Sequence, residues 1–136
     1  PIFASVDENR RFGEAARRAI EASDRSVAVI ASGSLSHKLI PNAEVGDNQW
    51  MQVGSEFNRQ VDLRVLDLWN QGRYREFCRM LPEYSTKCNG EALMIDTHML
   101  FGLLGWEEYQ GRAELLEEYY PSSGSGQVSA EFHLEA

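Results

Sequence analysis

The stretch that decides how this sequence folds is Ile30-Ala31-Ser32-Gly33-Ser34-Leu35-Ser36-His37. The apolar run from Val27 to Ala31 is typical of a buried strand, and the small residues after it predict a turn that leads to His37. In α/β folds, reactive groups often lie in tight turns at the ends of strands. An imidazole there can take up and release protons near neutral pH. The same histidine can equally be a solvated or hydrogen-bonded loop residue, and the local sequence leaves both interpretations open.

Upstream of this stretch, the pattern predicts a strand–helix–strand unit. Ile2–Val6 is typical of a short buried strand, and Asp7 can cap a helix from about Glu8 to Ala22. A second strand is predicted over Val27–Ser32 after a turn at Asp24-Arg25. Such a unit implies a parallel pair with a right-handed crossover, and therefore an α/β fold. The apolar stripe expected on the helix consists of Phe12, Ala15, Ala16, Ala19 and Ile20.

Downstream, the periodicity predicts mainly helices and then strands. A loop is expected over 41–48, and helices are expected over 49–70, 74–81 with a further turn from Pro82, and 91–104. Residues 113–120 have the length of either a strand or a short helix. The serine- and glycine-rich run 121–126 predicts a turn-rich loop, and the alternating pattern of 127–134 predicts a half-buried strand.

Composition narrows the class of protein. A chain of 136 residues fits one domain, and its net charge of −8 argues against a nucleic-acid partner, because phosphate affinity needs clustered cations. No apolar run approaches the roughly 20 residues that span a bilayer, so no membrane segment is expected. The two cysteines, Cys78 and Cys88, are too few for a disulfide framework or a structural zinc site. We therefore expect reduced thiols and a cytoplasmic location.

Two further places can carry chemistry. After the break at Asn89-Gly90, Glu91 stands at an expected helix start, where a carboxylate can be a metal ligand or simply pair with the helix dipole. The run 121–126 can wrap a ligand or form a solvated turn, but it lacks the lysine of a P-loop. We expect His98 to be a packed or surface residue and His133 to lie on a polar face. The residues alone thus suggest one acid–base group and one carboxylate ligand.

Several longer motifs, in order, resemble one family. The turn Ala31–His37 resembles the catalytic-histidine turn of the class III extradiol ring-cleaving dioxygenases. Four later segments are similar to the homoprotocatechuate-cleaving branch of that family. They are 56–65 (Glu-Phe-Asn-Arg-Gln-Val-Asp-Leu-Arg-Val), 76–84 (Glu-Phe-Cys-Arg-Met-Leu-Pro-Glu-Tyr), 90–106 with Gly90-Glu91, Asp96-Thr97 and Met99–Trp106, and the tail 121–128. The similarity runs from about Phe12 to the end of the chain.

The resemblance implies an α/β fold with a central mixed sheet flanked by helices. It also implies a non-haem Fe(II) held by two histidines and one glutamate, with open positions for a catechol and O2. Glu91 would be the carboxylate ligand, and His37 would be the acid–base residue. The two histidine ligands belong to an N-terminal half that this sequence lacks, so residues 1–136 resemble the C-terminal portion of a single catalytic domain. Alone, this portion is expected to be inactive.

The function implied is ring cleavage of a substituted catechol, similar to 3,4-dihydroxyphenylacetate, by O2 to a ring-opened semialdehyde. The expected partners are these small molecules, the missing half and further copies of the enzyme. Two departures from the family pattern stand out. A substrate-lining loop usually follows the first strand, where Ser5-Val6-Asp7 connects directly here, and Ile95 replaces a histidine of the branch. The alternatives are a catalytically silent subunit of the same fold and an unrelated α/β domain without a metal.

Overall fold

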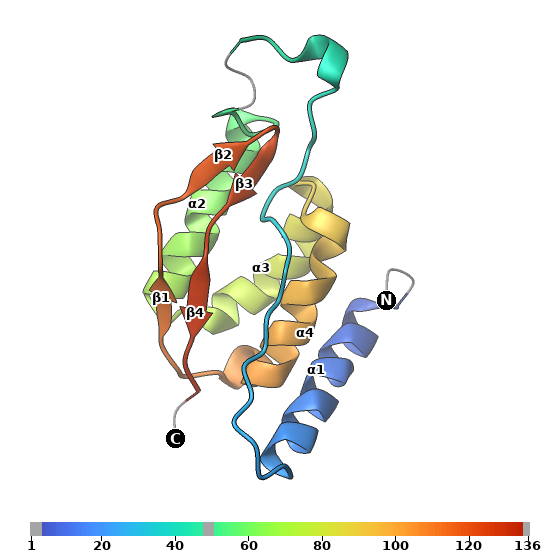
Figure 1. The fold of residues 1–136 in the computed structure, drawn as a ribbon, viewed down its shortest axis with the longest axis vertical. Coiled ribbons are helices and arrows are strands. Elements are labelled where there is room, and N and C mark those ends of the chain that lie inside the picture. Colours follow the sequence, from blue (N-terminus) through green and yellow to red (C-terminus); the bar gives the residue numbers. More distant parts are fainter. Residues whose placement is uncertain (1–3, 48–50, 135–136) are drawn as a thin grey trace.

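Four helices and two small antiparallel ladders make up the computed structural model, which describes residues 4–47 and 51–134 (Figure 1). The helices are α1 (Val6–Glu21), α2 (Glu56–Asn70), α3 (Tyr74–Lys87) and α4 (Ile95–Leu104). Short turns of helix are η1 (Asn42–Glu44), η3 (Glu91–Met94) and η4 (Trp106–Glu108). The strands are β1 (Ala113–Leu115), β2 (Tyr120–Ser122), β3 (Ser125–Gln127) and β4 (Ala130–Phe132).

The N-terminal strand predicted over Ile2–Val6 is wrong where the structure describes it. Ile2 and Phe3 lie outside the described residues, and Val6 already begins α1. Ser5, rather than Asp7, is the N-cap, because its hydroxyl accepts a hydrogen bond from Glu8 N and the Glu8 carboxylate accepts one from Ser5 N at 2.7 Å. In this reciprocal capping box, the backbone N–H groups of Ser5 and Glu8 find their acceptors within the start of the helix, so they do not need a neighbouring strand.

The face by which α1 packs on α4 differs from the predicted apolar stripe. Gly13 is buried, and a Cβ on it would lie 1.9 Å from Met99 O; one on Gly102 would lie 2.2 Å from Arg10 O. The two backbones therefore approach each other through glycines, which turns the opposite face of α1 outward. Phe12 is 61% exposed, and only Ala16 and Ile20 of the predicted stripe pack against the core.

The second predicted strand, Val27–Ser32, is also wrong: these residues have no regular secondary structure. The segment runs between α4 and the β3–β4 side of the molecule (Figure 1). Ile30 is 87% exposed, and Val27 and Val29 are about half exposed. A strand needs a partner for its backbone groups, and within the described residues none lies beside this part of the chain. The parallel pair and the central mixed sheet are consequently not seen in the described residues.

The C-terminal ladders correct the loop predicted over 121–126. β2 and β3 form a hairpin whose central residues, Ser123 and Gly124, have φ values of 51° and 98°, as a type I′ turn requires. β1 pairs with β4 in antiparallel register, with Ala113 opposite Phe132. The strand alternative for 113–120 and the strand within 127–134 are thus confirmed over Ala113–Leu115 and Ala130–Phe132.

The core lies between α2, α3, α4 and the strands. Aromatic rings fill it: Trp69 lies 5.3 Å from Phe77 and 5.1 Å from Phe132, and Phe77 lies 4.7 Å from Phe101. α2 begins at Glu56, capped by Ser55, later than predicted, and α3 continues through Pro82 as one helix. Both cysteines are buried free thiols, as expected. None of the helices in the described part of the chain is long and apolar enough to cross a bilayer.

Candidate active site

The turn that ends in His37 lies against the segment that carries Glu91. His37 N donates a hydrogen bond to Asn89 O at 2.8 Å, and Glu91 N donates one to Leu35 O at 3.2 Å. Ser36 and Gly90 form an antiparallel bridge between these two bonds. Because backbone hydrogen bonds fix the two segments side by side, the two residues singled out from the sequence become neighbours.

The two side chains meet at a partly open surface. His37 Nδ1 lies 3.9 Å from Glu91 Oε2, and both side chains are about one third exposed. Ser125 Oγ lies 2.8 Å from the same Nδ1, within hydrogen-bond distance. Among the described residues no hydrogen bond involves the other ring nitrogen, Nε2, which is therefore the one available to a bound molecule. His37 is a hydrogen-bonded turn residue, and it also stands beside a carboxylate.

The Glu91 carboxylate is held in its charged form. Burial opposes the charge, but the N–H and hydroxyl of Ser34, together with His37, outweigh that effect and hold the pKa of Glu91 below its usual value. A carboxylate must be ionised to bind a cation. The charge and the partial exposure of Glu91 both fit a metal ligand.

The pattern predicted that Glu91 would stand at the start of a long helix, and this prediction is wrong. Ala92, Leu93 and Met94 have φ values of 46°, 58° and 57°, and α4 begins only at Ile95. Left-handed backbone is unfavourable for residues with a Cβ. The long helix thus starts at Ile95 rather than at Glu91, and a left-handed turn separates Glu91 from α4.

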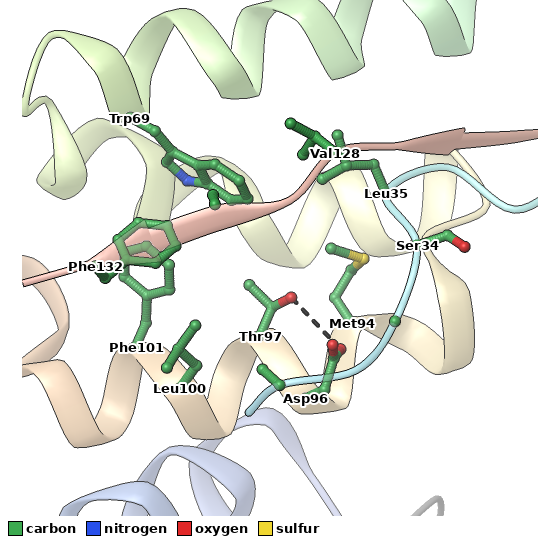
Figure 2. Close-up of a pocket in the computed structure, with 13 residues that line it drawn as sticks. Ser34, Leu35, Trp69, Met94, Asp96, Thr97, Leu100, Phe101, Val128 and Phe132 are labelled. Atoms are coloured by element: carbon green, nitrogen blue, oxygen red, sulfur yellow. Dashed lines mark hydrogen bonds between the residues drawn. The ribbon is translucent and has the colours of Figure 1, made fainter. Parts of the chain in front are cut away.

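Behind the Ser34 turn lies a cavity of about 90 Å³. Figure 2 shows Ser34 and Leu35 on one side of it, Trp69, Phe101 and Phe132 on another, and Asp96 and Thr97 on α4. Thr97 Oγ1 donates a hydrogen bond to Asp96 Oδ1, and burial, with a contribution from the Glu91 charge, raises the pKa of Asp96. Most of the residues that line the cavity are apolar, and Asp96 is the acidic residue among them.

The other two histidines stand apart from this site. His98 is buried, stacks on Trp106 at 5.9 Å, and has Nδ1 2.6 Å from Met94 O, so the expectation of a packed residue is confirmed. Burial lowers the pKa of His98. His133 is partly exposed beside Glu114 and Glu131, which agrees with the predicted polar face.

The sequence analysis gave no role beside His37 to Asp62 or Ser125, two polar residues that contact the His37 turn. Both are buried: Asp62 is fully buried, and Ser125 is 2% exposed. The spacing of Asn58, Asp62, Val65 and Trp69 follows one face of α2, so an acidic residue on the buried stripe was a readable signal. Ser125 lies in the run 121–126 that the sequence analysis singled out, but its contact with His37 could not be predicted, because His37 comes from a distant segment.

The part of the chain that the structure describes does not bring together a complete set of metal ligands. In residues 4–47 and 51–134, no group of three His, Cys, Asp or Glu side chains can hold a metal ion together. A complete triad of two histidines and one carboxylate is therefore not present among these residues, and Glu91 is a carboxylate that lies beside one histidine, His37.

Comparison with known proteins identifies relatives of this chain. Residues 3–133 match the family model described as the catalytic LigB subunit of aromatic ring-opening dioxygenase. The chain is 49% identical to the 3,4-dihydroxyphenylacetate 2,3-dioxygenase of Escherichia coli over 115 residues, which are 83% of this chain and 41% of that protein. The chain thus spans less than half the length of this curated relative. Since the family model covers nearly the whole chain, this chain belongs to the LigB family of aromatic ring-opening dioxygenases.

Proposed function

We propose that this chain supplies the carboxylate ligand and the acid–base residue of an Fe(II)-dependent extradiol dioxygenase. The substrate is a catechol with a side chain, of the 3,4-dihydroxyphenylacetate type, which O2 converts to a ring-opened semialdehyde. The observation that carries the proposal is the approach of His37 Nδ1 to Glu91 Oε2 at 3.9 Å on a partly open surface. The family and the relative's name support the reaction class.

Each residue has a distinct part in this proposal. Glu91, ionised and fixed by Ser34, binds iron through its carboxylate. Bound iron supplies an electrophilic, redox-active centre with open positions. Ser125 holds the imidazole ring of His37 at Nδ1, and Nε2 of that ring exchanges a proton with the catechol hydroxyl. The chain's own contribution is thus one ligand and one proton-transfer group.

The remaining iron ligands come from the part of the family fold that this chain does not span. We place that part of the enzyme against the exposed apolar segment 27–30 of this chain. A hollow of about 220 Å³ lies beside that segment, lined by Phe12, Ala16, Val29, Ile30 and Leu103 among others. Large exposed apolar surfaces of this kind mark interfaces. The relative has more than half its length outside the match, enough to cover it. We call the two parts together the complete enzyme.

The test is reconstitution of the complete enzyme with Fe(II) without oxygen, followed by addition of air and 3,4-dihydroxyphenylacetate. We expect a yellow ring-opened product and consumption of one O2 per catechol. Residues 1–136 alone, treated in the same way, serve as the control and are expected to give no product.

Two other outcomes would change the proposal. Iron binding without product from this catechol, but with product from another, would keep the reaction and change the substrate. Failure of the complete enzyme to bind iron at all would contradict the proposal and favour a catalytically silent subunit of the same fold.

A further inference from the structure

The carboxylate of Asp62 is the most heavily hydrogen-bonded side chain near the His37 turn. It is fully buried in α2, and each of its oxygens accepts hydrogen bonds. Tyr84 donates to Oδ1 and Tyr119 to Oδ2, both at 2.7 Å. A buried carboxylate is costly unless donors surround it. One hydroxyl from α3 and one from the segment before β2 therefore each satisfy one hydrogen-bonding position of the Asp62 carboxylate.

The rest of the Asp62 carboxylate is directed at the turn itself. Ser36 donates to it twice, from its backbone N to Oδ1 at 3.2 Å and from its hydroxyl to Oδ2 at 2.7 Å. Ser36 is fully buried and immediately precedes His37. These two bonds fix the residue before the histidine, the bond from His37 N to Asn89 O fixes the backbone of the histidine itself, and the bond from Lys38 N to Gly124 O fixes the residue after it.

The β2–β3 hairpin completes the support. Gly126 N donates to Ser36 O, and Leu35 N donates to Gly126 O, both at 2.9 Å. A Cβ on Gly126 would lie 2.0 Å from Asp62 Oδ2, so only glycine lets β3 approach both the turn and the carboxylate. The preceding residue, Ser125, is thereby placed with its hydroxyl 2.8 Å from His37 Nδ1.

We propose that Asp62 and Ser125 are positioning residues for His37: Asp62 fixes the backbone of the turn through Ser36, and Ser125 holds the imidazole ring. The proposal rests on the acid–base role given to His37 above. A proton-transfer group works only when it is held at the correct distance and angle to the substrate. Two buried polar groups that converge on one partly exposed ring serve that requirement.

The experiment uses Ser125→Ala and Asp62→Asn in the complete enzyme. We expect each to lower kcat by about 10- to 100-fold, with KM and iron content nearly unchanged, since neither residue contacts Glu91 or the open surface. Ser85→Ala is the matched control. It removes an equally buried serine hydroxyl, whose hydrogen bond runs to Pro82 O within α3, and it should leave kcat unchanged.

A double-mutant cycle separates positioning from general destabilisation. In the His37→Ala background, Ser125→Ala should lower kcat no further, because the ring it holds is gone. If Ser125→Ala costs the same factor in both backgrounds, the proposal is wrong. If Asp62→Asn fails to fold, the double-mutant cycle of Ser125→Ala with His37→Ala still tests whether His37 is positioned by its neighbours.

A readout without turnover keeps this proposal distinguishable from the proposed function. In the iron-free complete enzyme, the imidazole ¹⁵N signals of His37 should move in Ser125→Ala and Asp62→Asn but not in Ser85→Ala. Unchanged signals in the first two variants would overturn the positioning role. Moved signals in an enzyme that cleaves no catechol would support the positioning of His37 and contradict the proposed function alone.

Discussion

At the scale of single residues, the chemistry of the site follows from two side chains with different needs. Glu91 needs a charge, and the donors of Ser34 keep it charged against burial. His37 needs one fixed and one available ring nitrogen, and Ser125 engages Nδ1. The residue types suggested one acid–base group and one carboxylate ligand, and the hydrogen bonds of both side chains are compatible with the roles that we propose for them.

Replacing the carboxylate tests the ligand role. Glu91→Gln should lower the iron content of the complete enzyme strongly, because an amide oxygen is a weaker ligand than a carboxylate. Iron can be counted with a ferrous chelator after desalting. Glu44→Gln, on the exposed turn η1, is the control and should retain the metal. Full iron content in Glu91→Gln would remove this residue from the ligand set.

Replacing the imidazole tests the proton-transfer role. His37→Ala should retain iron but lower kcat by about 10²- to 10⁴-fold, the usual contribution of a positioned acid–base group. Steady-state oxygen uptake measures the change. Loss of iron together with activity would instead assign His37 to the metal.

The buried imidazole of His98 predicts a pH dependence of stability. Burial lowers its pKa in the folded state, so its contribution is complete above the unfolded value of about 6.5 and is lost as pH falls below it. The free energy of unfolding, measured with denaturant, should therefore be lower at about pH 5.5 than at about pH 7. His98→Met lacks the titrating group and should show a smaller difference; an equal difference would exclude His98 as its source.

At the scale of elements, the site depends on irregular connections between regular ones. The left-handed turn η3 carries Glu91 away from the axis of α4, and the β2–β3 hairpin presses against the His37 turn. Regular helix at residues 91–94 would place the carboxylate differently. Local strain is a common feature of functional sites.

The strain in η3 can be measured by substitution. Ala92 is exposed with φ of 46°, so Ala92→Gly should raise the free energy of unfolding by about 0.5–1 kcal/mol, since glycine accepts left-handed backbone without a Cβ clash. The matched control is Ala15→Gly on the exposed face of α1. This substitution should lower the free energy of unfolding by about 1 kcal/mol. Destabilisation in both variants would show that Ala92 is unstrained.

At the scale of the whole molecule, the exposed apolar segment 27–30 is where we propose that the rest of the complete enzyme packs. Ile30 is 87% exposed and adjoins the hollow beside α1 and α4. We expect Ile30→Lys to change the stability of residues 1–136 by less than about 0.5 kcal/mol but to destabilise the complete enzyme clearly, because a charge would be buried there. Thermal unfolding of both forms tests this expectation.

A second exposed residue provides the control for that comparison. Leu116 is 59% exposed and follows β1, away from the hollow. Leu116→Lys should have the same small effect in both forms. If Ile30→Lys also behaves identically in both, the segment 27–30 is not an interface.

The sequence by itself was sufficient to indicate the family, to predict most of the helices and to single out His37 and Glu91 as candidate site residues. Helix periodicity and end signals are local, so they could be read directly, and α1, α2 and α3 agree in kind with the prediction. The strand at Val27–Ser32 failed because a strand forms only with a partner, which the pattern of one segment cannot supply. The tertiary structure alone decided that residues 35–37 lie against 89–91, that η3 turns left-handed, and that Asp62 and Ser125 hold the His37 turn. Those features depend on hydrogen bonds between segments far apart in the chain, and local sequence does not encode which distant groups will meet.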